Sequence, residues 1–334
     1  MIAAARCASC TPRRSSRRRA GKRTPTQRVS RTGPIIGCLA TALGLPTVVQ
    51  PAAAQERELR SYGPGAPEAK LMVFYSSSIA FSPIAVPWGA TGLSAKSVSV
   101  GRAIPRTELA IEVSYIPRLS ADQRTVGTDK PEATNLAPVF GRPRLGIRLP
   151  WGLGLEGSWI PPFRLFDVTA NVLSAAVSRA FDVGSGVRLT PRLSVLTGRV
   201  EGPITCNRDA ASHGNQSLMT YYTFVCHGND SRDYFDPRHV SGELIVARSF
   251  ANGRWEPYLS AGARGERTRF DVGVIRDDGT RDLDNPILEV KTTRVYGTAG
   301  ASWIGLRRTR LSGELFYAPG SVFTVRAFAG VHLW

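Results

Sequence analysis

The stretch Ser321–Trp334, with the sequence SVFTVRAFAGVHLW, decides the fold. Phe323, Val325, Ala327, Ala329, Val331 and Leu333 occupy every second position of this stretch. The intervening positions hold Thr324, Arg326, Gly330 and His332, together with Phe328 and Trp334. A period of two indicates a β-strand whose two faces have different surroundings. The chain is therefore expected to end in a strand with one apolar and one mainly polar face.

A strand that stops on a terminal aromatic residue resembles the closing strand of a bacterial outer-membrane β-barrel. In that family the apolar positions usually share the phase of the terminal aromatic residue, whereas here the apolar face is one residue out of phase with Trp334. The resemblance implies two partners. One is outer-membrane lipid, and the other is the barrel-assembly machinery, which would recognise the C-terminal strand ending at Trp334. The alternative is an edge strand of a soluble β-sandwich.

The same alternation recurs along the chain from Thr107 onwards. For example, Leu109, Ile111 and Val113 alternate with Glu108, Ala110 and Glu112. The pattern predicts an all-β fold, an antiparallel up-and-down transmembrane β-barrel covering 107–334, with ten strands preferred over twelve. The predicted strands are 107–115, 144–149, 153–159, 168–181, 187–195, 240–248, 255–268, 288–306, 309–317 and 321–334. A change of phase near Thr292 and Thr293 predicts a β-bulge in the strand 288–306.

The connections between these strands sort by length. Short turns are predicted at Pro150-Trp151, Asp182–Gly186, Ala251–Gly253 and Leu306–Arg308. The loops on the other side are 117–138, 160–166, 201–238, 271–286 and 318–320, and all the long loops are among them. Outer-membrane barrels have short periplasmic turns and longer outer loops. A soluble sandwich has no physical reason to sort its loops in this way, so the connections favour the membrane barrel.

The N-terminal region is basic and then apolar. Residues 1–54 contain ten Arg and Lys residues and no acidic residue, followed by an apolar stretch at 35–49 and small residues at Ala52 and Ala54. This order predicts a secretory signal peptide over 1–54, cleaved between Ala54 and Gln55; the alternative is a disordered basic tail. Without those ten residues the net charge of +17 falls to +7, which argues against a nucleic-acid partner. Residues 55–106 are predicted only as a lead-in, a plug or an extra strand.

Charged residues occupy the face opposite the apolar one in many predicted strands. Because an Arg at the bilayer midplane costs about 2–4 kcal/mol, these side chains are expected to face the lumen and to pair there. The predicted lumen-lining residues are Glu108, Glu112, Arg144, Arg148, Glu156, Arg188, Arg192, Glu243, Arg264, Glu266, Arg294, Arg310, Glu314 and Arg326. They predict an internal stabilising network, a narrow hydrophilic pore of mixed charge or a ligand site.

Cys206 and Cys226 are the only cysteines after the predicted cleavage site. An exported chain meets an oxidising compartment, so a disulfide between them is expected to staple the loop 201–238. A zinc site would need His213 and His227 as well, but these four residues have no recognised ligand spacing. The acidic run at 277–284 lacks the spacing of a calcium loop. No metal and no cofactor is therefore predicted.

The function expected from the sequence is a structural barrel or narrow pore in the bacterial outer membrane, without a catalytic site. One alternative is a rim hydrolase of the omptin type, because omptins are ten-stranded outer-membrane barrels with Asp and His residues at the outer rim. The candidates for that chemistry are Asp233, Asp236 and His239, or Asp209 and His213. The other alternative is a soluble secreted all-β binding module.

Overall fold

The computed structural model describes residues 57–63, 65–82, 106–120, 123, 125–126, 130–132, 137–149, 152–212, 216–250, 254–305 and 309–333. The predicted signal peptide, its cleavage site at Ala54 and Gln55, and the terminal Trp334 lie outside these ranges. Within them, none of the helices is both long and apolar enough to cross a membrane.

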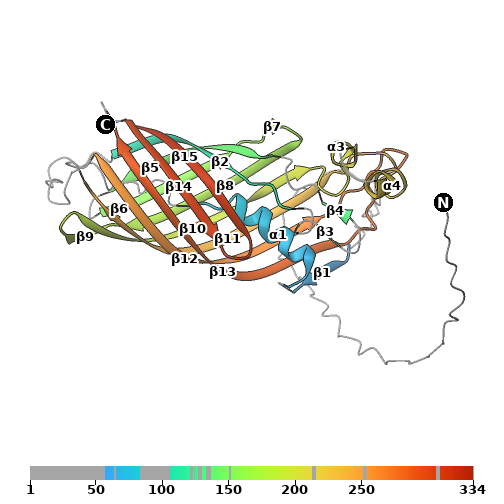
Figure 1. Ribbon diagram of the computed structural model, residues 1–334, viewed down its shortest axis with the longest axis horizontal. Helices are drawn as coiled ribbons and strands as arrows, with labels where there is room; N and C mark the ends of the chain where they lie inside the picture. The colour runs from blue at the N-terminus through green and yellow to red at the C-terminus, as the bar shows by residue number, and fades with distance from the viewer. Residues whose placement is uncertain are drawn as a thin grey trace, which may run out of the picture. The chain divides into compact units, whose positions relative to one another are not determined.

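Ten antiparallel strands close into a barrel in which each strand pairs with its neighbours along the chain (Figure 1). The barrel closes through the pairing of the last strand with the first. The strands are β2 (Arg106–Tyr115), β5 (Val139–Arg148), β6 (Leu153–Ile160), β8 (Val168–Arg179), β10 (Val187–Gly202), β11 (Asp233–Arg248), β12 (Trp255–Asp271), β13 (Ile287–Ile304), β14 (Thr309–Ala318) and β15 (Val322–His332). The predicted all-β antiparallel barrel of ten strands is confirmed, and with it the resemblance to outer-membrane barrels at the level of architecture.

The two faces of the wall differ as the alternation predicts. On β2, Leu109, Ile111 and Val113 are 50%, 53% and 42% exposed. On β15, Phe323 and Val325 are similarly exposed, whereas the intervening side chains are buried. Water-soluble monomers rarely expose a large contiguous apolar surface, whereas a barrel in lipid exposes one all round its wall.

The long loops gather at the end of the barrel opposite the C-terminus, which we call the outer end (Figure 1). They carry the short strands β3 (Thr125–Val126), β4 (Lys130–Pro131) and β7 (Arg164–Leu165), and the helices α3 (Arg208–Ser212) and α4 (Gln216–Phe224). At the inner end β9 (Phe181–Gly184) pairs with β10. The other predicted short turns lie wholly or mostly outside the described residues.

The strands extend further toward the outer end than the sequence pattern predicts. β10 reaches Gly202 and β11 begins at Asp233. Both ends of the predicted loop 201–238, at 201–202 and 233–238, are therefore strand. The predicted β-bulge in β13 is wrong, because β12 and β13 pair in one unbroken register from Ile287 to Trp303. The phase changes because the surroundings change: Leu288 and Val290 turn inward onto an apolar cluster, while Glu289 on the other face pairs with Arg267, Arg269 and Lys291.

A helix lies inside the outer half of the barrel. β1 (Leu59–Tyr62) pairs in parallel with β13 at Ile287–Val290, and α1 (Pro67–Ser78) follows it. Ala69, Met72 and Val73 of α1 pack against wall residues that include Phe235 and Phe270. A helix in contact with its surroundings on most sides needs no single apolar stripe, so α1 gives no amphipathic signal in the sequence.

Small residues let large side chains cross the lumen, and Gly300 on β13 is one of them. A Cβ there would lie 2.5 Å from the Tyr258 ring and 2.6 Å from the Gly313 carbonyl oxygen. Gly300→Ala is expected to lower the free energy of unfolding by about 1–3 kcal/mol, because the ring must shift and its hydroxyl donates to Glu314. Gly313→Ala on the adjacent strand, where a Cβ meets nothing within 4 Å, serves as the control. Urea titration in lipid vesicles, read from the unheated gel band, measures both, and equal midpoints would contradict this account.

Candidate functional site

Charged side chains from β2, β5, β6, β10 and β11 form a continuous ion-pair chain inside the barrel. Arg144 on β5 bonds Glu112 on β2 at 2.7 Å and Glu156 on β6 at 2.7 Å. Arg192 on β10 then bridges Glu156 at 3.1 Å to Glu243 on β11. These groups are buried, so each charge depends on its neighbours for the stabilisation that water would otherwise give.

Arg144 and two further inward-facing arginines, Arg142 and Arg326, hold the segment that follows α1. Arg142 donates to the carbonyl oxygens of Ile79 and Ala80 at 3.1 and 3.3 Å. Arg144 donates to the Ser82 carbonyl at 3.2 Å, and Arg326 donates to the Ala80 carbonyl at 2.9 Å. Ile79 caps the C-terminus of α1, and Ala80 and Ser82 lie beyond the helix, so these buried carbonyls have no helical partner and accept from the guanidinium groups instead.

The Phe81 ring occupies the centre of this arrangement. The guanidinium carbons of Arg144 and Arg192 lie 4.5 and 4.6 Å from its centroid. A cation over an aromatic face in a desolvated site contributes about 2 kcal/mol or more. We call the residues Ile79–Ser82 and the four arginines Arg142, Arg144, Arg192 and Arg326 the arginine clamp.

Wall groups also contact α1 directly along one side. Ser76 contacts the His239 ring nitrogen Nε2, and Arg264 donates to Ser77 Oγ at 2.8 Å. Ser82 Oγ donates to Glu314 at 2.5 Å. Hydrogen bonds from several strands therefore fix α1 inside the barrel.

The structure places eleven of the predicted lumen-lining residues in buried positions. Arg148, Arg188 and Arg294 are partly buried. Beyond the ion-pair chain, Arg310 bonds Glu108 at 2.8 Å and Arg264 bonds Glu266 at 2.5 Å. The sequence pattern missed Arg142, because the predicted strand 144–149 begins after it, although Arg142 shares the phase of Arg144. It also missed Ser76, Ser77 and Ser82, which no strand pattern signals.

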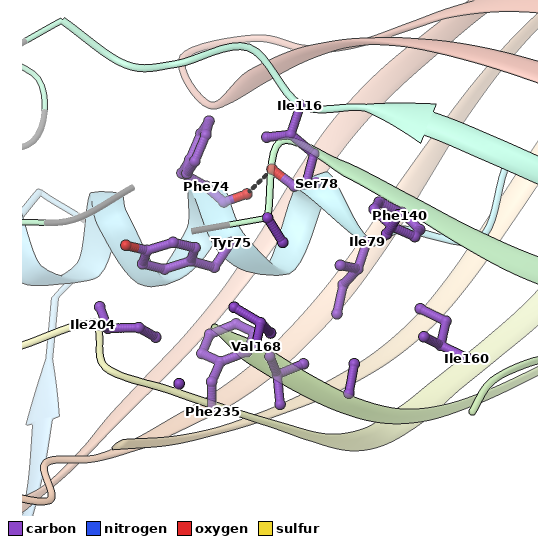
Figure 2. A pocket seen from close by; sticks show the side chains of 14 residues that line it. Phe74, Tyr75, Ser78, Ile79, Ile116, Phe140, Ile160, Val168, Ile204 and Phe235 are labelled. Carbon is purple, nitrogen blue, oxygen red and sulfur yellow. Dashed lines mark hydrogen bonds between the residues drawn. The ribbon is translucent and has the colours of Figure 1, made fainter. Parts of the chain in front are cut away.

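Above the arginine clamp an apolar cavity separates α1 from the wall (Figure 2). It holds about 720 Å³ of empty space, including the part that is open to solvent. Phe74, Tyr75, Ser78 and Ile79 line it from the α1 segment, and Phe140, Ile160, Ala170, Val200 and Phe235 are among the residues that line it from the barrel. The Ser78 hydroxyl donates to the Phe74 carbonyl at 2.8 Å, as the dashed line in Figure 2 shows, so it is satisfied within the helix.

The residues considered for a rim hydrolase have separate structural roles. Asp233 is buried and accepts hydrogen bonds from the backbone of Thr205 and Gly273 and from Ser231. Asp236 lies on the other face of β11 and pairs with Arg199 at 2.7 Å. His239 is six residues from Asp233, about 20 Å along a strand, and contacts α1. The structure does not bring these three together, and His213 lies outside the described residues.

The outer loops contain the expected disulfide and a compact acidic turn. Cys206 and Cys226 are bonded to each other, which removes both sulfurs from any zinc site. In the turn, Arg276 pairs with Asp282 and Asp284 at 2.5 and 2.7 Å. Hydrogen bonds from the side chain and backbone N–H of Thr280 lower the pKa of Asp278. No group of three potential metal ligands gathers anywhere in the described part of the chain.

Arg192→Met tests the ion-pair chain. The substitution leaves Glu156 and Glu243 buried without their shared cation, so it is expected to lower the free energy of unfolding by about 3–5 kcal/mol. Arg199→Met breaks an exposed pair on the same strand and is expected to cost about 0–1 kcal/mol. Urea unfolding of both variants in lipid vesicles measures the difference. Similar losses of unfolding free energy for the two variants would show that burial of the ion-pair chain contributes nothing to stability.

No protein-family model matches the sequence, and no match was found among the curated proteins. Several solved structures are similar. They include the attachment invasion locus protein Ail of Yersinia pestis, at 10% identity and a TM-score of 0.24, covering 68% of this chain and 95% of that one. The toluene transporter TodX of Pseudomonas putida is similar at 10% identity and a TM-score of 0.30, covering 83% and 78%. The β-domain of the Bordetella autotransporter BrkA is similar at 12% identity and a TM-score of 0.32, covering 68% and 97%. At these values the likenesses carry no argument about activity.

Proposed function

We propose that this protein is a bacterial outer-membrane β-barrel whose lumen is closed by α1, rather than an open hydrophilic pore or a soluble binding module. The closed barrel with apolar side chains exposed around its wall carries the proposal for the membrane. Lipid around the wall stabilises those side chains, and the barrel leaves no backbone edge along most of its height. Insertion would use the barrel-assembly machinery acting on the C-terminal strand that ends at Trp334.

The arginine clamp supports a closed lumen over a conducting one. The charges that would line a pore are paired with each other or with the carbonyls of Ala80 and its neighbours. An ion on the barrel axis would have to break these contacts in a site with little water. The proposed role is that of a plugged barrel without enzymatic activity.

Cell fractionation and a heat-modifiability gel test the location. The protein is expected in the outer-membrane fraction, and its unheated band should migrate differently from the boiled one, because the closed barrel resists detergent at room temperature. Release in full by osmotic shock without detergent would overturn the membrane proposal and favour a soluble module.

Planar-bilayer recordings test the closed lumen. The unmodified protein is expected to give no steady conductance. Val73→Asp introduces a charge into a buried position of α1, displaces the helix and is expected to produce conductance. Lys70→Asp, on the exposed side of the same helix, is the control and should remain silent. Steady conductance of the unmodified protein, or a silent Val73→Asp variant that still folds, would contradict the proposal.

A further inference from the structure

The chemistry of the cavity restricts what it can bind. Among the lining residues that the structure describes, almost all are apolar and none is charged. The serine among them, Ser78, donates within α1. A charged ligand would lose its hydration there without gaining a partner, whereas a small apolar molecule loses nothing and gains contacts.

The barrel wall is incomplete beside this cavity. The β5–β6 ladder runs from Arg148↔Gly154 to Arg144↔Ser158 and then stops. β5 nevertheless continues toward the outer end to Val139, and these residues remain paired with β2 on their other side. Among the residues that the structure describes, 139–143 have no strand partner on the β6 side. We call this interruption the β5–β6 seam.

Proline explains why the ladder stops at this place. Continuing the register would set Pro143 opposite Trp159 and would then set residues Pro161 and Pro162 against the outer end of β5. Proline has no N–H to donate to a ladder, and it is confined to strand edges and ends. Because the sequence itself prevents pairing here, the seam is a built feature of the wall.

The seam and the cavity meet. Ala137 and Phe140 line the cavity from one side of the seam, and Ile160 lines it from the other. On the outer surface next to the seam, Val113 and Tyr115 of β2 pair with Gly141 and Val139 and are 42% and 49% exposed. Tyrosine and tryptophan are typical of the membrane interface, so the seam faces the outer boundary of the apolar belt.

We propose that the cavity binds a small uncharged apolar molecule and exchanges it sideways with the surrounding lipid through the β5–β6 seam. The route along the barrel axis is closed by α1 and the arginine clamp. This inference rests on the proposed membrane location. All variants are therefore tested only as barrels whose unheated gel band shows that they are folded in lipid, so that failure of binding stays separate from failure of the membrane proposal.

Fluorine NMR with hexafluorobenzene, a small apolar probe, tests the site in lipid nanodiscs. A bound resonance distinct from the lipid-dissolved one is expected for the unmodified protein. Ala170→Trp fills the cavity from β8 and should abolish the bound resonance, and the milder Val168→Phe should weaken it at least threefold. Leu173→Trp on the lipid-facing side of the same strand is the matched control and should leave it unchanged. No bound resonance in the unmodified protein, or one that survives in both cavity variants, would overturn the site.

Saturation transfer between the bound and lipid resonances tests the route. Gly141→Trp places a bulky side chain on the outer face of the seam and is expected to slow exchange at least tenfold without loss of the bound population. Gly157→Trp is the matched control, because Gly157 pairs with Leu145 in the closed part of the same two strands and a Cβ there meets nothing within 4 Å. Equal exchange rates in the two variants would overturn the lateral route.

Discussion

The structure depends on buried guanidinium groups that satisfy two kinds of acceptor at once. Arg144 bonds the carboxylates of Glu112 and Glu156 on the wall and also the Ser82 carbonyl of the internal segment. Each carboxylate alone would be strongly destabilised in the barrel interior, and so would each arginine. In the structure the arginine contacts the two carboxylates and the Ser82 carbonyl, and these contacts offset the cost of removing each group from water. The internal segment is therefore part of the solution to burying charge, and a barrel with these charges but without α1 would need water in its place.

This arrangement divides the lumen into two zones. Toward the inner end the wall presents ion pairs, and toward the outer end it presents apolar clusters around α1. The helix follows this division mainly along its axis, although Ser76 and Ser77 also meet the polar wall groups His239 and Arg264 on one side. Residues such as Val73 pack in the apolar zone, and the segment after Ser78 enters the polar one. The apolar cavity lies in the first zone, where the wall side chains and the helix do not fill the space between them.

Much of the fold follows from alternation of side chains, and the failures have physical causes. The ten strands were predictable because the outer and inner faces of the wall impose opposite demands on successive residues, and the loops could be sorted by the lengths of the gaps between those strands. At the outer ends of the strands the apolar side chains of Leu288 and Val290 turn inward onto the cluster around α1, so a rule that puts apolar residues on the outer face of the wall misplaces the strand ends. The ionic pairs of the candidate site were only predictable as a set, since no sequence pattern specifies that Arg192 joins Glu156 to Glu243. The role of α1 was not predictable from periodicity. The helix contacts the barrel on most of its sides, so its sequence carries no single apolar stripe.

The β5–β6 seam is at odds with the rule that barrels leave no open edge in hydrocarbon. Two features reduce the conflict. Pro143 has no N–H, so the edge of β5 carries one fewer donor in need of a partner. In the proposed membrane location, the exposed aromatic residues Tyr115 and Trp159 next to the seam would lie at the interface, where water and lipid headgroups reach the backbone. An interruption at that level costs less than one at the bilayer centre. The same position gives an apolar molecule in the outer leaflet a short path to the cavity, so the feature that makes the gap tolerable also makes it usable.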